Sequence, residues 1–256
     1  MIFNLGIGDI LLTRMIFDTI GIEKEFNIYK PIIDQYREGS EEYLNFVIKL
    51  SKTLFGENSG KVISHREPLF NNTSYEIGDV KLSKYFNLKN TLKEPYIVFH
   101  TKARFDYQKN SEYFKKNDLS IFTQFLRDFK TDKKIIILGE REISSNYSTS
   151  FNNQSLIYKE LQLLKNKNKV FDFTTHTLNN KPDWKTFERD MSYIQYADLN
   201  VGVGYGGNMV SCFAFSRKNC FFLSRIQHPL LKYFNEYIHN TLETYLEEIK
   251  KEHEHG

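Results

Sequence analysis

The sequence predicts an α/β protein made of two lobes, each built on a mostly parallel sheet, and two observations carry this prediction. Short apolar runs that are typical of strands alternate with amphipathic stretches that are typical of helices. Such alternation indicates strand–helix–strand units, whose strands pair in parallel. A polar segment, residues 71–94, separates two series of these units. We therefore expect two Rossmann-like lobes facing a cleft, residues 1–90 and 91–256, with the N-terminal lobe reduced.

Composition narrows the classes of protein that remain. The chain has 256 residues, of which 40% are hydrophobic, so it can bury a core. Its net charge is only +3, which argues against a dedicated nucleic-acid binder, because such proteins concentrate positive charge on one face. The two cysteines, Cys212 and Cys220, imply no disulfide framework and suit a reducing compartment. No apolar run approaches 18 uncharged residues and no basic leader precedes Asp9, so we expect a cytoplasmic protein.

The elements of the N-terminal lobe follow from hydrophobic spacing and glycine positions. Residues 2–5 form a short apolar run that predicts a strand, and a glycine turn at 6–9 leads to a helix over 10–17. Residues 41–55 place apolar side chains at helical spacing, and Gly56 ends that helix. Residues 62–64 predict another strand. The order is strand, helix, helix, strand.

The second lobe has a more regular pattern. Its apolar runs, some of them unbroken by polar residues as in buried parallel strands, predict strands at 96–100, 134–139, 170–173, 199–203 and 220–223. Stretches with an apolar face predict helices at 118–129, 155–165, 183–196, 208–215 and 229–250.

The first candidate site is the segment Gly6-Ile7-Gly8-Asp9, between a predicted strand and a predicted helix. A carboxylate at the carboxyl end of a strand, where α/β proteins bind ligands, can act as a general base on a hydroxyl group. The alternative is that Asp9 only caps the helix, because acids are favourable at helix N-termini. Both interpretations remain open.

The second candidate is the glycine turn Gly204-Tyr205-Gly206-Gly207-Asn208 between a strand and a helix. Glycines let a phosphate approach the backbone, and the helix dipole favours its negative charge. The turn lacks the acid about 20 residues on that completes a dinucleotide fingerprint, and it lacks the Gly-Lys-Ser/Thr of a P-loop. A plain tight turn is the alternative.

The third candidate is the loop His100-Thr101-Lys102-Ala103-Arg104-Phe105-Asp106. Its two cations, Lys102 and Arg104, would suit a diphosphate, and the alternative is a solvated charged loop. All three segments follow predicted strands at their carboxyl ends, and this shared placement favours a ligand site.

Two of these segments resemble one family. Residues 4–13 look like the opening of heptosyltransferase-like glycosyltransferases (family 9), which begin with a strand, a Gly-Asp turn and a helix. Residues 197–209 resemble the late segment of that superfamily, where a glycine turn binds the donor diphosphate. Tyr96–His100 and Ile135–Glu140 look like the first two strands of its C-terminal lobe. The resemblance implies the two-lobed GT-B fold, a nucleotide-sugar donor and an inverting mechanism with Asp9 as the base. It also implies that the last helix, residues 229–250, returns to the N-terminal lobe.

The resemblance also implies roles and partners for specific residues. No Asp-x-Asp motif occurs, which disfavours metal-dependent transfer, so we expect no metal and no cofactor besides the donor. The expected donor-binding residues are Gly8, His100, Lys102, Arg104, Glu140, Gly206, Gly207 and Asn208. Glu140, Arg141 and Glu142 would lie near the nucleoside, and the alternative is that they are ordinary loop charges. The expected partners are a nucleotide-sugar and a glycan acceptor in glycan biosynthesis; nucleic acid is excluded, and a peripheral membrane contact stays open.

Three alternatives to this transferase remain open. His100 to Asp106 faintly resembles a loop of fucosyltransferases with the same two-lobed fold. A second alternative is a non-catalytic protein of this type that only binds a sugar or a partner. The third is a Rossmann-type oxidoreductase or methyltransferase that uses Gly202 to Gly207.

Overall fold

The structure is a computed structural model. It describes residues 7–29, 41–64, 77–78, 80–101, 116–141, 154–175, 183–203, 207–222, 238–239 and 241–254. The chain divides into two compact units: unit 1 comprises Met1–Lys89 and Lys181–Met191, and unit 2 comprises Asn90–Asn180 and Ser192–Gly256. The two-lobe prediction assigns residues 181–191 to the second lobe, whereas the structure gathers them into unit 1.

Unit 1 is a small α/β unit. Its elements are α1 (Ile7–Ile20), β1 (Ile28–Tyr29), α3 (Glu41–Phe55), β2 (Val62–Ile63), the 3₁₀ turn η1 (Leu82–Tyr85) and the first turns of α6 (Trp184–Tyr196). The strands β1 and β2 pair in parallel, with Ile28 opposite Val62. Residues 10–17 of α1, including the charged Arg14, are all buried, so this stretch of the helix has no solvent-exposed face. The predicted strand at residues 2–5 lies outside the described residues.

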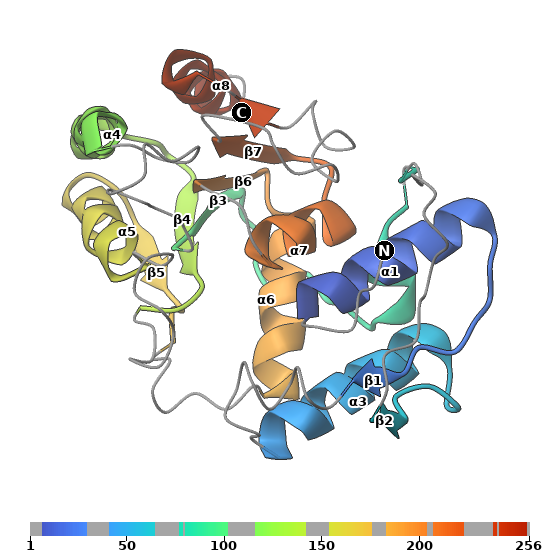
Figure 1. Cartoon of the computed structure of the whole chain (residues 1–256). Coiled ribbons are helices and arrows are strands. Elements are labelled where there is room, and N and C mark those ends of the chain that lie inside the picture. The colour runs from blue at the N-terminus through green and yellow to red at the C-terminus, as the bar shows by residue number, and fades with distance from the viewer. Residues whose placement is uncertain are drawn as a thin grey trace. The chain divides into compact units, whose positions relative to one another are not determined.

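Unit 2 contains a parallel sheet of six strands (Figure 1). They are β3 (Tyr96–His100), β4 (Lys134–Leu138), β5 (Val170–Asp172), β6 (Leu199–Val203), β7 (Asn219–Phe222) and β8 (Ile238–His239). Their spatial order is β5-β4-β3-β6-β7-β8, and every neighbouring pair is parallel. With β3 counted as the first strand, this is the order 3-2-1-4-5-6 of Rossmann folds. The predicted α/β class with a parallel sheet is therefore confirmed.

Helices cover both faces of this sheet, which explains why its central strands are mostly apolar. On one face lie α4 (Lys116–Asp128), α5 (Gln154–Leu161) and α8 (Leu242–Glu254). Their buried side chains, such as Phe122, Ile157 and Tyr245, join the sheet residues Ile97, Ile135 and Val201 in one core. On the other face lie α7 (Gly207–Phe215), whose Phe213 ring contacts Phe221, and the end of α6, whose Tyr193 ring contacts Tyr96.

The C-terminal segment differs from its prediction. A single helix was expected over 229–250, but the structure has the strand β8 at Ile238–His239 and begins the helix α8 at Leu242. The Thr241 side chain accepts a hydrogen bond from the Thr244 backbone N–H, so it is the N-cap that sets this start. Tyr245 and Ile249 of α8 are buried in the core of unit 2, and the expected return of this helix to the N-terminal lobe stays a prediction.

Two further observations concern the chain as a whole. None of the helices that the structure describes is long and apolar enough to span a membrane. Both cysteines are buried free thiols.

Candidate functional site

The sheet of unit 2 has a topological switch point between its central strands. From β3 the chain continues to β4 and β5 on one side, whereas from β6 it continues to β7 and β8 on the other. Ligands of open α/β sheets bind beyond the carboxyl ends of the strands at such a point, because the diverging connections leave a crevice there. The β6 strand ends at Val203, and α7 begins at Gly207, four residues later. The N-terminus of α7 therefore lies at the switch point.

The predicted donor-binding residues are only partly brought together there. Gly207 and Asn208 form the first turn of α7, and His100 is the last residue of β3. Glu140 follows β4, two strands away from β6, and forms a parallel bridge with Thr175. Lys102, Arg104 and Gly206 lie outside the described residues.

His100 connects the sheet to α7 beneath the switch point. Its Nε2 lies 3.2 Å from Sγ of Cys212, and the side chain is only 3% exposed. Burial lowers the pKa of His100 to about 4, although a hydrogen bond with the Asn200 side chain partly opposes this shift. Burial also raises the pKa of the Cys212 thiol, which can therefore donate its S–H to the imidazole. At neutral pH the two form an uncharged pair, not the ion pair of a reactive thiolate.

Asp9 and Gly8 belong to unit 1 and lie inside a helix. We expected them in a turn that precedes the helix, but α1 begins at Ile7, so both residues are part of its first turn. The Asp9 carbonyl accepts a hydrogen bond from the Thr13 hydroxyl at 2.7 Å. A half-buried carboxylate in a first turn interacts favourably with the helix dipole. This position fits the capping interpretation and leaves a role as general base as a proposal.

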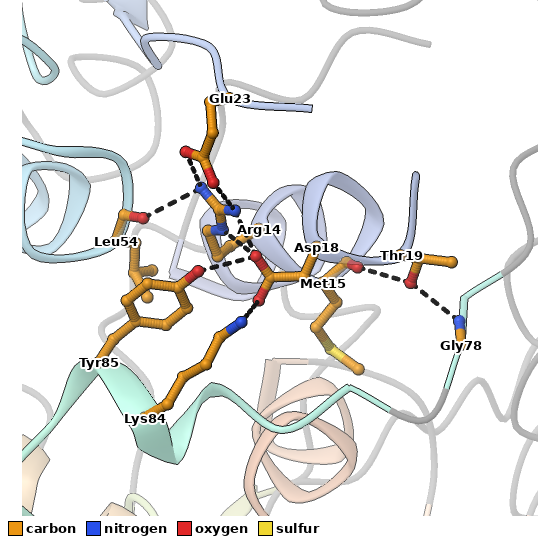
Figure 2. Close-up of polar contacts among 9 residues, drawn as sticks. All are labelled: Arg14, Met15, Asp18, Thr19, Glu23, Leu54, Gly78, Lys84 and Tyr85. Atoms are coloured by element: carbon orange, nitrogen blue, oxygen red, sulfur yellow. Dashed lines mark hydrogen bonds and ion pairs between the residues drawn. The ribbon is translucent and has the colours of Figure 1, made fainter. Parts of the chain in front are cut away.

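A network of charges that the sequence did not reveal fixes α1 within unit 1 (Figure 2). Arg14, which is 2% exposed, donates hydrogen bonds to the carboxylates of Asp18 and Glu23 and to the carbonyl of Leu54 in α3. The Asp18 carboxylate also accepts a hydrogen bond from the Tyr85 hydroxyl at 2.7 Å. Lys84 lies on the other side of this carboxylate, with Nζ 3.0 Å from its second oxygen.

The electrostatics of this network explain why the charges can be buried. Burial disfavours the Asp18 carboxylate, but hydrogen bonds from Tyr85, Arg14 and Lys84 outweigh this effect and lower its pKa. The Arg14 guanidinium also lies over the ring of Tyr85, at 5.2 Å from its centroid. Removing one partner would leave an uncompensated buried charge. The network therefore ties α1 to the end of α3 and to η1.

A second polar cluster lies beyond the ends of β4 and β5 in unit 2. The Arg141 Nε donates a hydrogen bond to the Thr174 hydroxyl at 2.8 Å, and the Arg141 guanidinium lies over the Tyr158 ring. Thr174 and Tyr158 in turn donate hydrogen bonds to the Asp172 carboxylate. The sequence predicts Arg141 near the nucleoside but does not reveal its contacts, because Tyr158, Asp172 and Thr174 come from other segments of the chain.

Metal ligation has no candidate within the described ranges: no three His, Cys, Asp or Glu side chains there gather closely enough to hold an ion. In comparisons with protein-family models, curated proteins and solved structures, no match to this chain was found.

Proposed function

We propose that the chain is a metal-independent, inverting glycosyltransferase of the two-lobed GT-B type, which moves a sugar from a nucleotide-sugar donor to a glycan hydroxyl. One observation carries the proposal: the glycine-rich segment after β6 leads into α7 at the switch point of a 3-2-1-4-5-6 sheet. Backbone N–H groups at a helix N-terminus are suited to a diphosphate. The resemblance of residues 4–13 and 197–209 to family 9 glycosyltransferases supports a nucleotide-sugar, rather than another nucleotide, as the ligand of this site.

The proposed reaction uses residues of this chain and no metal. The N–H groups at the start of α7, together with Lys102 and Arg104, stabilise the charge that develops on the leaving diphosphate. Asp9 accepts the proton of the acceptor hydroxyl while the oxygen of that hydroxyl attacks the anomeric carbon of the donor sugar. The bond between that carbon and the diphosphate oxygen breaks, so the configuration inverts. Cytoplasmic location belongs to the same proposal, because both cysteines are free thiols that suit a reducing compartment.

A Rossmann-type oxidoreductase or methyltransferase is another alternative, which the same strand order would suit. One observation weakens it. A Cβ at Gly202 would lie 2.4 Å from Cε1 of the buried Phe221 ring, so packing within the sheet accounts for this glycine. Gly202 therefore cannot be counted as part of a dinucleotide fingerprint, and only Gly204, Gly206 and Gly207 remain for a ligand.

Ligand binding by the intact protein separates these classes. We expect a nucleotide-sugar or its nucleoside diphosphate to raise the melting temperature, because a ligand that binds only the native state stabilises it. The panel should contain sugars linked to uridine, guanosine, adenosine and cytidine nucleotides, with NAD and S-adenosylmethionine as competitors. Stabilisation by NAD or S-adenosylmethionine alone would contradict the proposal.

The series Gly207→Ala and Gly207→Val tests the position of the diphosphate. Side chains at the first residue of α7 should obstruct its close approach, so we expect affinity to fall with side-chain size, by about tenfold or more for Val, which corresponds to about 1.4 kcal/mol. Because Gly207 is helical, and both replacements have a higher helix propensity than Gly, the melting temperature should not decrease. A folded Gly207→Val variant with unchanged affinity would place the diphosphate elsewhere.

A further inference from the structure

A buried hydrogen bond joins α7 to the central strand β3 beneath the switch point. Nε2 of His100, the last residue of β3, lies 3.2 Å from Sγ of Cys212 in α7, and both side chains are buried. Burial lowers the pKa of His100 and raises that of the Cys212 thiol, so both groups are uncharged at neutral pH. The thiol therefore donates its S–H, and the imidazole nitrogen accepts it.

Asn200 of β6 favours the imidazole tautomer that this bond requires. Its amide nitrogen donates to the carbonyls of Ile194 and Lys218, at 3.0 and 3.2 Å. This orientation leaves the buried Oδ1 for the imidazole, and Oδ1 has no other hydrogen-bond partner in the described part of the chain. A neutral imidazole has one N–H and one acceptor nitrogen, so an N–H given to Asn200 leaves Nε2 for the thiol.

The ring of Phe221 connects the same histidine to α7 by an apolar contact. The centroids of the His100 and Phe221 rings are 6.2 Å apart, although β6 lies between the strands that carry them. The Phe221 ring reaches across β6 because Gly202 has no side chain: a Cβ there would lie 2.4 Å from Cε1 of the ring. Phe221 also packs on Phe213 of α7, with centroids 5.8 Å apart. Two neighbouring residues of α7, 212 and 213, thus attach it to the sheet.

The two contacts constrain α7 in different ways. Apolar burial is non-directional, so the contact of Phe213 holds α7 on the sheet without fixing its exact position. A hydrogen bond weakens steeply away from its preferred distance and angle, so the Cys212 thiol defines a position. Cys212 is five residues from Gly207, the first residue of α7, which is about 7.5 Å along a helix. A shift of this short helix at Cys212 therefore also moves the N–H groups of its first turn.

We propose that the hydrogen bond between His100 and Cys212 positions the N-terminus of α7 for the diphosphate of the donor, and that His100 acts through α7 without touching the donor. Donors that stabilise a developing charge work at about 2.7–3.1 Å, and a misplacement of about 1 Å can cost on the order of 100-fold in rate. His100 and Cys212 are then positioning residues. The inference rests on the proposed function, which places the diphosphate at this helix.

The experiment measures nucleotide affinity in variants at Cys212. Isothermal titration of the full chain with UDP, GDP, CDP and ADP finds the tightest of the four, which then serves for every variant. Cys212→Ala removes the donor and should bind about tenfold less tightly, the effect of losing one hydrogen bond. Cys212→Ser keeps a hydroxyl donor and should restore the affinity to within about threefold of the wild type. Each dissociation constant is measured well below the melting temperature of the variant, so that it describes the folded protein.

A second variant tests the other partner of the bond. His100→Phe keeps a ring against Phe221 but removes the acceptor nitrogen, so we expect the same loss of affinity as for Cys212→Ala. If the two residues act as a pair, the double variant should lose no more affinity than either single variant. This comparison also keeps the proposal testable if one of the single variants does not fold, because the other removes the same bond.

Cys220→Ala is the matched control. Cys220 is the other buried thiol of unit 2, and its Sγ donates to the Tyr245 carbonyl of α8 at 3.7 Å, in the core between the sheet and α8. The loss of this thiol should lower the melting temperature as Cys212→Ala does, because both leave a small gap in a core. Its nucleotide affinity should equal that of the wild type.

The pattern of affinities decides the proposal. Wild-type affinity in folded Cys212→Ala or His100→Phe, an equal loss in Cys220→Ala, or a loss in Cys212→Ser as large as in Cys212→Ala would overturn the role of the bond while the proposed nucleotide site stands. Failure of every nucleoside diphosphate and nucleotide-sugar to bind the wild type would overturn the proposed function, and this inference with it. The wild-type titration thus separates the two failures before any variant is made.

Discussion

At the residue scale, His100 shows how a polar side chain can be buried at the centre of a sheet. It is the last residue of β3, and its imidazole lies against Cys212 and Asn200. Asn200 is itself held by hydrogen bonds from its amide to the Ile194 and Lys218 carbonyls. Because all three groups are uncharged at neutral pH, the cluster avoids the large desolvation cost of a buried charge.

The pKa of His100 predicts a pH dependence of stability. The unfolded chain takes up a proton near the ordinary histidine value of 6.5, whereas the folded chain does so only at about 4. As the pH falls through this window the unfolded state binds more protons, so the free energy of unfolding should fall, by up to about 3 kcal/mol. Urea unfolding at pH 7 and pH 4.5 measures this loss, which His100→Gln should largely abolish.

The comparison of wild type with variant is necessary because another group opposes His100. Burial raises the pKa of Asp190 to about 6, so its contribution to stability grows as the pH falls through the same window. The difference between the two proteins removes this common contribution. His239→Gln is the control for the loss of an imidazole elsewhere in the fold, because His239 is half-buried and burial lowers its pKa as well. An equal pH dependence in wild type and His100→Gln would refute the prediction.

At the element scale, the packing between β6 and β7 depends on a glycine, Gly202, which leaves room for a ring from the neighbouring strand. Gly202 in β6 pairs with Phe221 in β7, and the ring fills the space that a Cβ at 202 would occupy. The Phe221 ring is 2% exposed and also packs on Phe213 of α7, so it cannot easily move aside.

Gly202→Ala should therefore destabilise unit 2, by about 1–3 kcal/mol, because the added methyl group overpacks a filled core. Phe221→Leu removes the ring atoms that clash, and the double variant should lose less stability than the sum of the two single variants. Chemical denaturation of the four proteins gives this double-mutant cycle. If the losses of unfolding free energy in the two single variants simply added up in the double variant, the Phe221 ring would not be the group that clashes with a side chain at position 202.

At the scale of the whole molecule, the proposed reaction draws on both units. It assigns donor binding to α7 in unit 2 and proton abstraction to Asp9 in unit 1. Measuring turnover therefore tests the proposal for the full chain. Measuring nucleotide affinity tests the proposed donor site in unit 2, and measuring stability tests the packing within each unit.

Asp9→Asn should lower turnover by about 10²- to 10⁴-fold, the usual contribution of a general base, with donor affinity unchanged. Loss of its charge near the helix N-terminus should cost only about 0.3–1 kcal/mol of stability. The measurement is the transfer rate with the donor found by titration and a panel of glycan acceptors, beside the melting temperature. Asp118→Asn in the first turn of α4 is the matched control and should keep full turnover. A small loss of stability with normal turnover in Asp9→Asn would make Asp9 only a helix-capping acid.

The sequence by itself determined most of the elements of unit 2, because their signal is local. Strands buried on both faces are mostly apolar, and β3 and β6 have the predicted bounds. The helix α3 in unit 1 likewise spans the predicted residues 41–55, since its apolar side chains repeat with the helical period. The short strands β1 and β8, of two residues each, carry too little pattern to be recognised.

Only the tertiary structure decided the strand order and the polar contacts of the candidate site. His100 and Cys212 are 112 positions apart, and Arg141 meets Thr174 across 33 positions, so no local pattern could pair them. The same is true of Gly202. From the sequence it could belong to a ligand-binding turn, whereas in the structure the Phe221 ring occupies the space that a side chain at this position would need. Hydrophobic periodicity reflects whether each residue is buried, so it can be read from neighbouring positions in the sequence. A hydrogen bond or a close packing contact depends instead on which distant residue the fold places next to a given side chain.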